Sequence, residues 1–130
     1  MNPHSALYYL LKALIDMNVT ETIQAIESNI NEAKKIADVG DCLERLRLNR
    51  DFKKVIMEGY FEKEAIRLVH LKADPKMQSP DSQKSILAQM DAIGSLNQYF
   101  YAVFAQAQIA RKAIVSDEEA RDELLAEGAE

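Results

Sequence analysis

Residues 19–40 read VTETIQAIESNINEAKKIADVG, and this stretch decides the fold class. Its apolar residues recur at alternating spacings of four and three, while the positions between them are mostly polar. This heptad pattern is typical of a helix that presents one apolar seam to a neighbouring helix. The seam consists of Val19, Ile23, Ile26, Ile30, Ala33 and Ala37. Gly40 then predicts the end of this helix, because glycine is common just past a helix C-terminus.

The seam allows two interpretations. In the first, it packs against another helix of the same chain. In the second, it forms a coiled coil with another subunit, which would make the protein a homo-oligomer. The candidate interface residues of that coiled coil are Val19, Ile23, Ile26 and Ile30.

The segment before the seam is also predicted to be helical. Asn2 and Pro3 suit the cap and the first position of a helix that runs to about Asp16. Apolar residues surround most of its circumference, which is more than a single surface helix carries. We therefore expect another part of the structure to cover it.

Local signals after the seam predict further helix starts and ends. Capping-box sequences begin at Asn18, Asp41 and Ser116, and each predicts the first turn of a helix. A short break at residues 49–51 would leave Asp51 as the cap of another helix. The dipeptide Asp74-Pro75 predicts a firm end, because the residue before proline avoids the α conformation.

The predicted fold is all-α, with four to five helices. A long helix from about Asp81 to Val115 is its expected spine, followed by an acidic tail that forms either a separate short helix or a frayed extension. Gly59 predicts a kink or a close helix crossing, and Gly94 predicts a close approach of another helix. The expected segments are residues 1–40, a helical pair with the heptad seam; residues 41–116, a helical core; and residues 117–130, the acidic C-terminal tail.

The composition excludes several classes of protein. With 48% hydrophobic and 28% charged residues, the chain is too apolar for a wholly disordered protein. Four Gly and three Pro are too few for a barrel or sandwich of short strands. Residues 6–15, ALYYLLKALI, are too short to cross a bilayer and do not form a signal peptide. We expect a protein of the reducing cytoplasm with no membrane contact.

The sequence carries no recognisable catalytic or metal-binding motif. A single cysteine, Cys42, and two distant histidines, His4 and His70, cannot build a zinc site. His70 is expected to be a partly buried core residue, and Cys42 a small half-buried one. We therefore expect no catalytic residues, no metal, no cofactor and no enzymatic activity.

The charged residues are segregated along the chain. Residues 117–130 hold seven acidic side chains against Arg121, a local net charge of −6. Between positions 45 and 54, five cations are opposed only by Asp51, a local net charge of +4. These five residues, the basic cluster, form either a solvated helix junction or a contact for an anion or an acidic partner: Arg45, Arg47, Arg50, Lys53 and Lys54. Phosphates are a weaker possibility than an acidic protein, because the pI is about 5.1.

Two stretches carry a family resemblance. Residues 51–75, DFKKVIMEGYFEKEAIRLVHLKADP, and residues 91–100, DAIGSLNQYF, resemble small helical proteins encoded among the virion-structure and DNA-packaging genes of tailed bacteriophages. The resemblance implies a non-enzymatic connector, internal or accessory capsid protein, or scaffold. Its implied partners are other virion or assembly proteins, and its implied locations are the host cytoplasm during assembly and the virion.

Two other functions agree with the same composition. A compact acidic helical protein also suits a small phage-encoded regulator that binds and inhibits a host enzyme. The basic cluster alone would suit a nucleic-acid-binding accessory protein. An inventory of purified particles separates the structural function from these alternatives.

Overall fold

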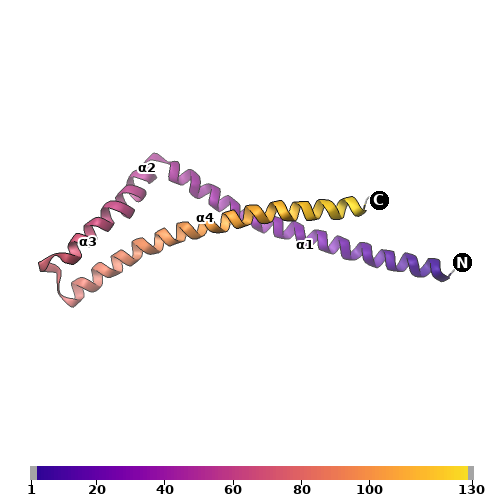
Figure 1. Ribbon diagram of the computed structural model, residues 1–130, viewed down its shortest axis with the longest axis horizontal. Helices are drawn as coiled ribbons and strands as arrows, with labels where there is room; N and C mark the ends of the chain where they lie inside the picture. The colour runs from indigo at the N-terminus through magenta and orange to yellow at the C-terminus, as the bar shows by residue number, and fades with distance from the viewer. Residues whose placement is uncertain (1–2, 129–130) are drawn as a thin grey trace. The chain divides into compact units, whose positions relative to one another are not determined.

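The computed structural model describes residues 3–128, and every element in that range is helical. The long helices are α1 (Pro3–Leu48) and α4 (Pro80–Gly128) (Figure 1). Between them lie α2 (Arg50–Phe52), the π-helix η1 (Lys53–Glu64), α3 (Ala65–Ala73) and the short 3-10 helix η2 (Pro75–Met77). The predicted all-α class is confirmed. Asn2, the expected first cap, lies outside the described residues.

The described residues form three long helical segments rather than four or five. α2, η1 and α3 follow one another without a gap, and neither Asn18, Gly40 nor Ser116 interrupts its helix. Near Asn18, polar side chains form hydrogen bonds with the backbone of α1 itself. The Thr20 and Thr22 hydroxyls donate to the carbonyls of Asp16 and Asn18, at 2.9 and 2.8 Å. Gly40 is buried and has no positive φ, so it is an internal helical residue rather than a stop.

The predicted breaks after residue 48 are confirmed, with one change of cap. Asn49 adopts extended backbone angles, and its side chain accepts a hydrogen bond from the Phe52 N–H at 2.9 Å. Asn49 is therefore the cap in place of Asp51. At the other end, Asp74 is extended and its Oδ1 accepts from the Lys76 N–H at 2.9 Å.

Gly59 and Gly94, for which the sequence predicts a kink or a close helix approach, differ in their surroundings. Gly59 lies in η1, where a Cβ would be 3.2 Å from the Lys54 carbonyl oxygen of the same helix. Gly94 is exposed, and a Cβ there would have no atom within 4 Å. The predicted close approach at Gly94 is therefore wrong, because the residue faces outward.

The first of two compact units joins the described residues up to Ala37 to those from Gln108 onward. Ala33 and Ala37 of α1 form its core with Ala110 of α4, and Ile114 packs against them. Farther along, Val19 and Ile23 share an open groove with Leu124 and Leu125. The two helical segments therefore run in opposite directions, as Figure 1 shows. The seam has a partner within its own chain, and a contact with another subunit stays a prediction.

The acidic tail continues α4 without a break as far as Gly128, the last described residue. The expectation of a separate tail helix is therefore wrong over the described residues. Asp117, Glu118 and Leu124 are half-buried. Packing against α1 explains the continuity, because it stabilises a helix beyond the local capping signal.

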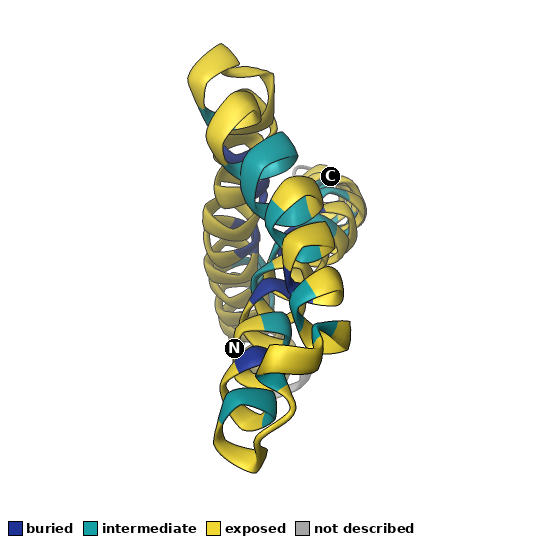
Figure 2. Ribbon diagram, turned by 90° about the vertical axis from the view of Figure 1, so that its left-hand side faces the viewer, coloured by how far each residue is buried: buried dark blue, intermediate teal, exposed yellow. Residues whose placement is uncertain are grey.

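The second unit spans Asp38–Ala107. Its core is formed by Leu68 of α3 with Ile86 and Ile93 of α4. Near the start of η1 the Phe100 ring of α4 lies 6.1 Å from Phe52 and 5.7 Å from Phe61, between ring centroids. Most of the ribbon is nevertheless exposed, with buried residues confined to narrow inner rows (Figure 2).

Candidate functional site

The basic cluster occupies the turn from α1 to η1 in the second unit. Arg45 and Arg47 lie in the last turn of α1, Arg50 begins α2, and Lys53 and Lys54 begin η1. All five side chains are exposed. The structure therefore places the predicted residues around one turn of the chain.

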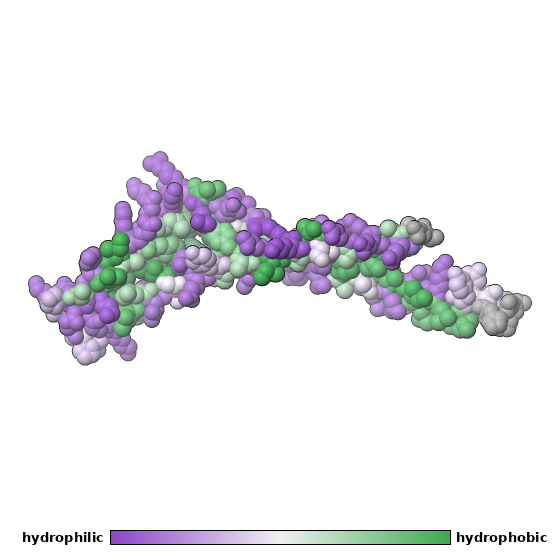
Figure 3. Space-filling view, in the orientation of Figure 1, coloured by the Kyte–Doolittle hydropathy of each residue, from purple (hydrophilic) through white to green (hydrophobic). Residues whose placement is uncertain are grey.

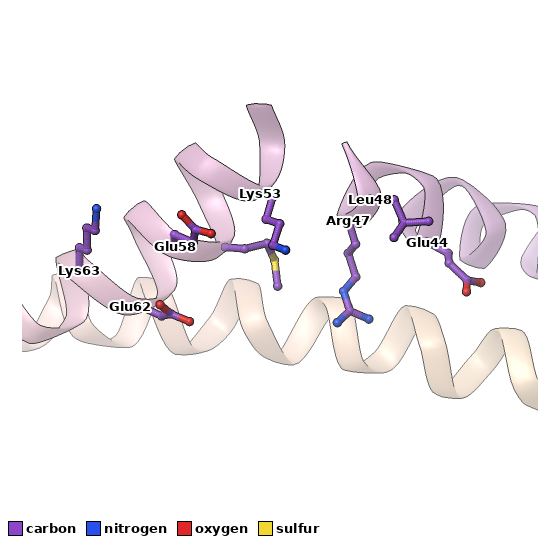
Figure 4. Close-up of a pocket in the computed structure, with 8 residues that line it drawn as sticks. Glu44, Arg47, Leu48, Lys53, Glu58, Glu62 and Lys63 are labelled. Carbon is purple, nitrogen blue, oxygen red and sulfur yellow. The ribbon is translucent and has the colours of Figure 1, made fainter. Parts of the chain in front are cut away.

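An open groove of about 570 Å³ lies beside this turn (Figure 4). Only Arg47 and Lys53 of the cluster line it, and Lys63 adds a third cation. The other lining residues are Glu44, Leu48, Met57, Glu58 and Glu62. Three carboxylates thus face the same space as three cations, so the groove is balanced in charge rather than basic.

The carboxylates of the groove were missed by the sequence interpretation. Counting charges along residues 45–54 leaves out Glu58 and Glu62, which come one and two turns later. The signal that could have found Glu58 is its spacing of five residues from Lys53 and from Lys63. In a π-helix hydrogen bonds join residues five apart, so Lys53, Glu58 and Lys63 return to nearby faces.

Two arginines of the basic cluster are held by contacts within the chain. The Arg47 guanidinium carbon lies 5.1 Å from the centroid of the Phe104 ring, within the range of a cation–π contact. Figure 4 shows the Arg47 side chain extending from α1 toward α4. The Arg45 Nη2 donates to the Cys42 Sγ at 3.3 Å. These contacts orient both side chains around the turn.

Cys42 and His70, the two residues considered for a chemical role, are both exposed. Cys42 is a free, exposed thiol on the rim of an apolar groove lined by Leu43, Leu46 and Tyr99, among others. His70 is exposed on α3. The expectations of a half-buried cysteine and a partly buried histidine are therefore both wrong. Within residues 3–128, no three His, Cys, Asp or Glu side chains are grouped to hold a metal ion.

One ion pair changes the pKa of its members, and it lies outside the groove. Two hydrogen bonds from the Arg67 guanidinium to Glu64, at 3.0 and 2.6 Å, lower the pKa of Glu64 below its usual 4.5. The same hydrogen bonds raise the pKa of Arg67. Because both groups remain open to solvent, this pair is a surface contact between successive turns.

A second candidate site is the start of α1, in the first unit. The groove that holds Leu124, Leu125 and Gly128 reaches α1 at Asp16, so α1 extends past the described end of α4 (Figure 1). We call residues 5–17 the overhang. Its large apolar side chains are 49–66% exposed: Leu7, Tyr8, Tyr9, Leu10, Leu11, Leu14, Ile15 and Met17. They form much of the apolar surface at that end of α1 in Figure 3. Within the described chain, the predicted cover for this helix is not present.

Comparisons with known proteins give no relative for this chain. No protein-family model, no curated protein and no solved structure matches the sequence. Within the described residues, no helix is both long enough and apolar enough to cross a bilayer.

Proposed function

We propose that this chain is a non-enzymatic structural or assembly protein that works by helix-mediated association with other proteins. The observation that carries the proposal is the overhang, which exposes eight large apolar side chains on one helix. A helix that is apolar around its circumference is normally covered. An assembly partner provides that cover while the rest of the chain keeps its own two cores.

The charges of the groove support a protein partner over a nucleic acid. A phosphate backbone is bound by cations, and each carboxylate nearby opposes it. Here Glu44, Glu58 and Glu62 face the same space as Arg47 and Lys53. A protein surface with both kinds of charge complements such a groove better than a polyanion does.

The assembly that we propose is the particle of a tailed bacteriophage. The support is the resemblance of residues 51–75 and 91–100 to proteins encoded among virion-structure and DNA-packaging genes. In this proposal the chain acts as a connector, an internal or accessory capsid protein, or a scaffold. It is present in the host cytoplasm during assembly, and its partners are other virion or assembly proteins.

An inventory of particles tests the proposal. Mass spectrometry with labelled reference peptides would count copies of this chain in purified virions and in precursor particles. We expect many copies per particle in at least one of the two. Absence from both, with recovery of the chain on a host enzyme, would replace the proposal with the regulator.

Binding to duplex DNA tests the remaining alternative. At about 50 mM salt we expect weak binding with a shallow dependence on salt. The double variant Arg47→Glu/Lys53→Glu changes the groove, and Arg50→Glu/Lys54→Glu is a control with the same change in charge outside it. Tight binding that both variants abolish would favour the nucleic-acid accessory, because phosphate contacts depend on the number of cations.

A further inference from the structure

We propose that the overhang is a docking surface for a second copy of this chain, and that two overhangs pack side by side in antiparallel orientation. The inference rests on the proposed assembly function and names the partner of one of its surfaces. It differs from the coiled coil predicted at Val19 to Ile30, because that seam already faces α4 of its own chain.

The apolar row that would form the contact has a definite length. Leu7, Leu11 and Leu14 follow the spacing of one helix face, and all three are about half exposed. The next residues on that face are Asn18 and Glu21, which are polar and exposed. The row therefore lies entirely within the overhang and covers about 10 Å of helix. A second overhang has the same length and covers the row completely.

The overhang carries almost no charge. Lys12 and Asp16 are its only charged residues, so its net charge is zero. Two copies can therefore approach without repulsion at the contact. The lack of a basic belt also makes an anionic membrane surface a poor partner, because interfacial helices are rich in Lys and Arg.

The helix ends decide the orientation. The first turn of α1 has no acidic residue, and the last turn of α4 has no basic one. Each end therefore lacks the charge that complements its own helix dipole. In an antiparallel pair, the start of α1 in one copy lies near Asp16 of the other, beside that copy's acidic end of α4. A parallel pair would instead place like charges together.

The symmetry of this contact makes it self-complementary. With Leu11 on the two-fold axis, Leu7 of one copy lies opposite Ile15 of the other, and each copy contributes the same surface. The pair closes on itself, so the contact yields dimers rather than filaments. In a larger assembly, such dimers would join two copies through their N-terminal ends.

Sedimentation of the full-length chain tests the docking surface. We expect a dimer at tens of micromolar and a monomer on dilution. Leu7→Glu/Leu14→Glu should raise the dissociation constant at least about 100-fold, because it places charges inside the contact. Both positions are exposed, so the far-ultraviolet circular dichroism should not change. Ile109→Glu/Val115→Glu is the matched control, since these exposed residues of α4 lie outside the overhang; it should leave the dimer intact.

Disulfide formation tests the orientation. In a Cys42→Ser background, Leu11→Cys should form a homodimer on oxidation, whereas Leu7→Cys should not. Antiparallel packing separates the two copies of residue 7 by about eight residues of helix, or about 12 Å, which is too far for a disulfide. A mixture of Leu7→Cys and Ile15→Cys chains should cross-link. Efficient self-linking of Leu7→Cys would mean parallel packing and would overturn the orientation.

Two results would overturn the docking surface itself. One is a monomer at all concentrations up to about 100 µM. The other is a dimer that survives Leu7→Glu/Leu14→Glu but dissociates with Ile23→Asp/Ile26→Asp, which would assign association to the seam. A chain that is abundant in particles yet monomeric in solution would overturn this inference alone and leave the proposed function standing.

Discussion

Residues 5–17 and residues 19–37 belong to the same helix, α1, but they differ in the pattern of their apolar side chains and in their burial. Residues 5–17 of α1 have apolar side chains around the helix, and those side chains are about half to two-thirds exposed. Residues 19–37 have one apolar row, and Ile30 in that row is only 2% exposed. The less apolar part is thus the better buried part. Burial follows from a neighbouring helix in the right register, rather than from the amount of apolar side chain.

Removing the same atoms from each part of α1 should have very unequal effects on stability. Ile30→Ala should lower the free energy of unfolding by about 2–5 kcal/mol, because it leaves a cavity between packed helices. Ile15→Ala, at a residue 60% exposed, should change it by less than about 0.5 kcal/mol in dilute protein. Denaturant unfolding of the two variants measures both values. Equal losses would mean that the overhang is covered within its own chain.

The boundary between the two parts of α1 lies at Asn18. Replacing Asn18 and, separately, Asn49 with alanine tests whether Asn18 is inside a helix or caps one. Asn49→Ala removes a cap that accepts from the Phe52 N–H and should cost about 0.5–2 kcal/mol. Asn18→Ala should instead stabilise by up to about 0.7 kcal/mol, because alanine is the better residue inside a helix. Thermal unfolding gives the sign of each change. A loss of stability with Asn18→Ala would indicate that α1 is capped there after all.

Gly59 and Gly94, two helical glycines of the second unit, should respond differently to alanine. Gly94→Ala should stabilise by up to about 1 kcal/mol, because the new Cβ meets nothing within 4 Å. Gly59→Ala should gain less or lose stability, since its Cβ lies 3.2 Å from the Lys54 carbonyl oxygen. Denaturant midpoints of the two variants measure the difference. Equal gains at both positions would argue against the close contact between a Gly59 Cβ and the Lys54 carbonyl oxygen in η1.

The smallest expected effect is at the exposed Glu64–Arg67 pair. Because Arg67 lowers the folded-state pKa of Glu64, the pair stabilises the fold above the usual pKa of 4.5, and this stabilisation is lost as the pH falls through the lowered value. Glu64→Gln should therefore lower the Tm slightly at pH 7, and this difference should shrink as the pH falls from 4.5 through the lowered pKa of Glu64. High salt should reduce the difference at pH 7. A difference that persists at low pH would point to packing rather than charge.

Local chemistry in the sequence determined the helical class and the places where the chain must turn. The seam of Ile23, Ile26 and Ile30 predicts a helix and the face that it buries. Asp74-Pro75 ends α3 because proline restricts the residue before it, whatever the rest of the fold does. The break near Asn49 and the start of α4 at Pro80 follow from similar local preferences. For the candidate site, the sequence placed the five cations of the basic cluster at one turn.

Only the tertiary structure decided where a helix continues and what shares a surface. The capping signals at Asn18 and Ser116 are each worth about a kilocalorie per mole, and packing of α1 on α4 outweighs them. Glu58 shares the groove with Lys53 and Lys63 because π-helical winding brings residues five apart to nearby faces, and Glu62 lies one turn beyond Glu58. Likewise, the sequence shows that residues 5–17 are apolar, but their exposure depends on α1 reaching past the described end of α4. Such properties depend on the positions of residues distant in the sequence, and local preferences cannot fix those.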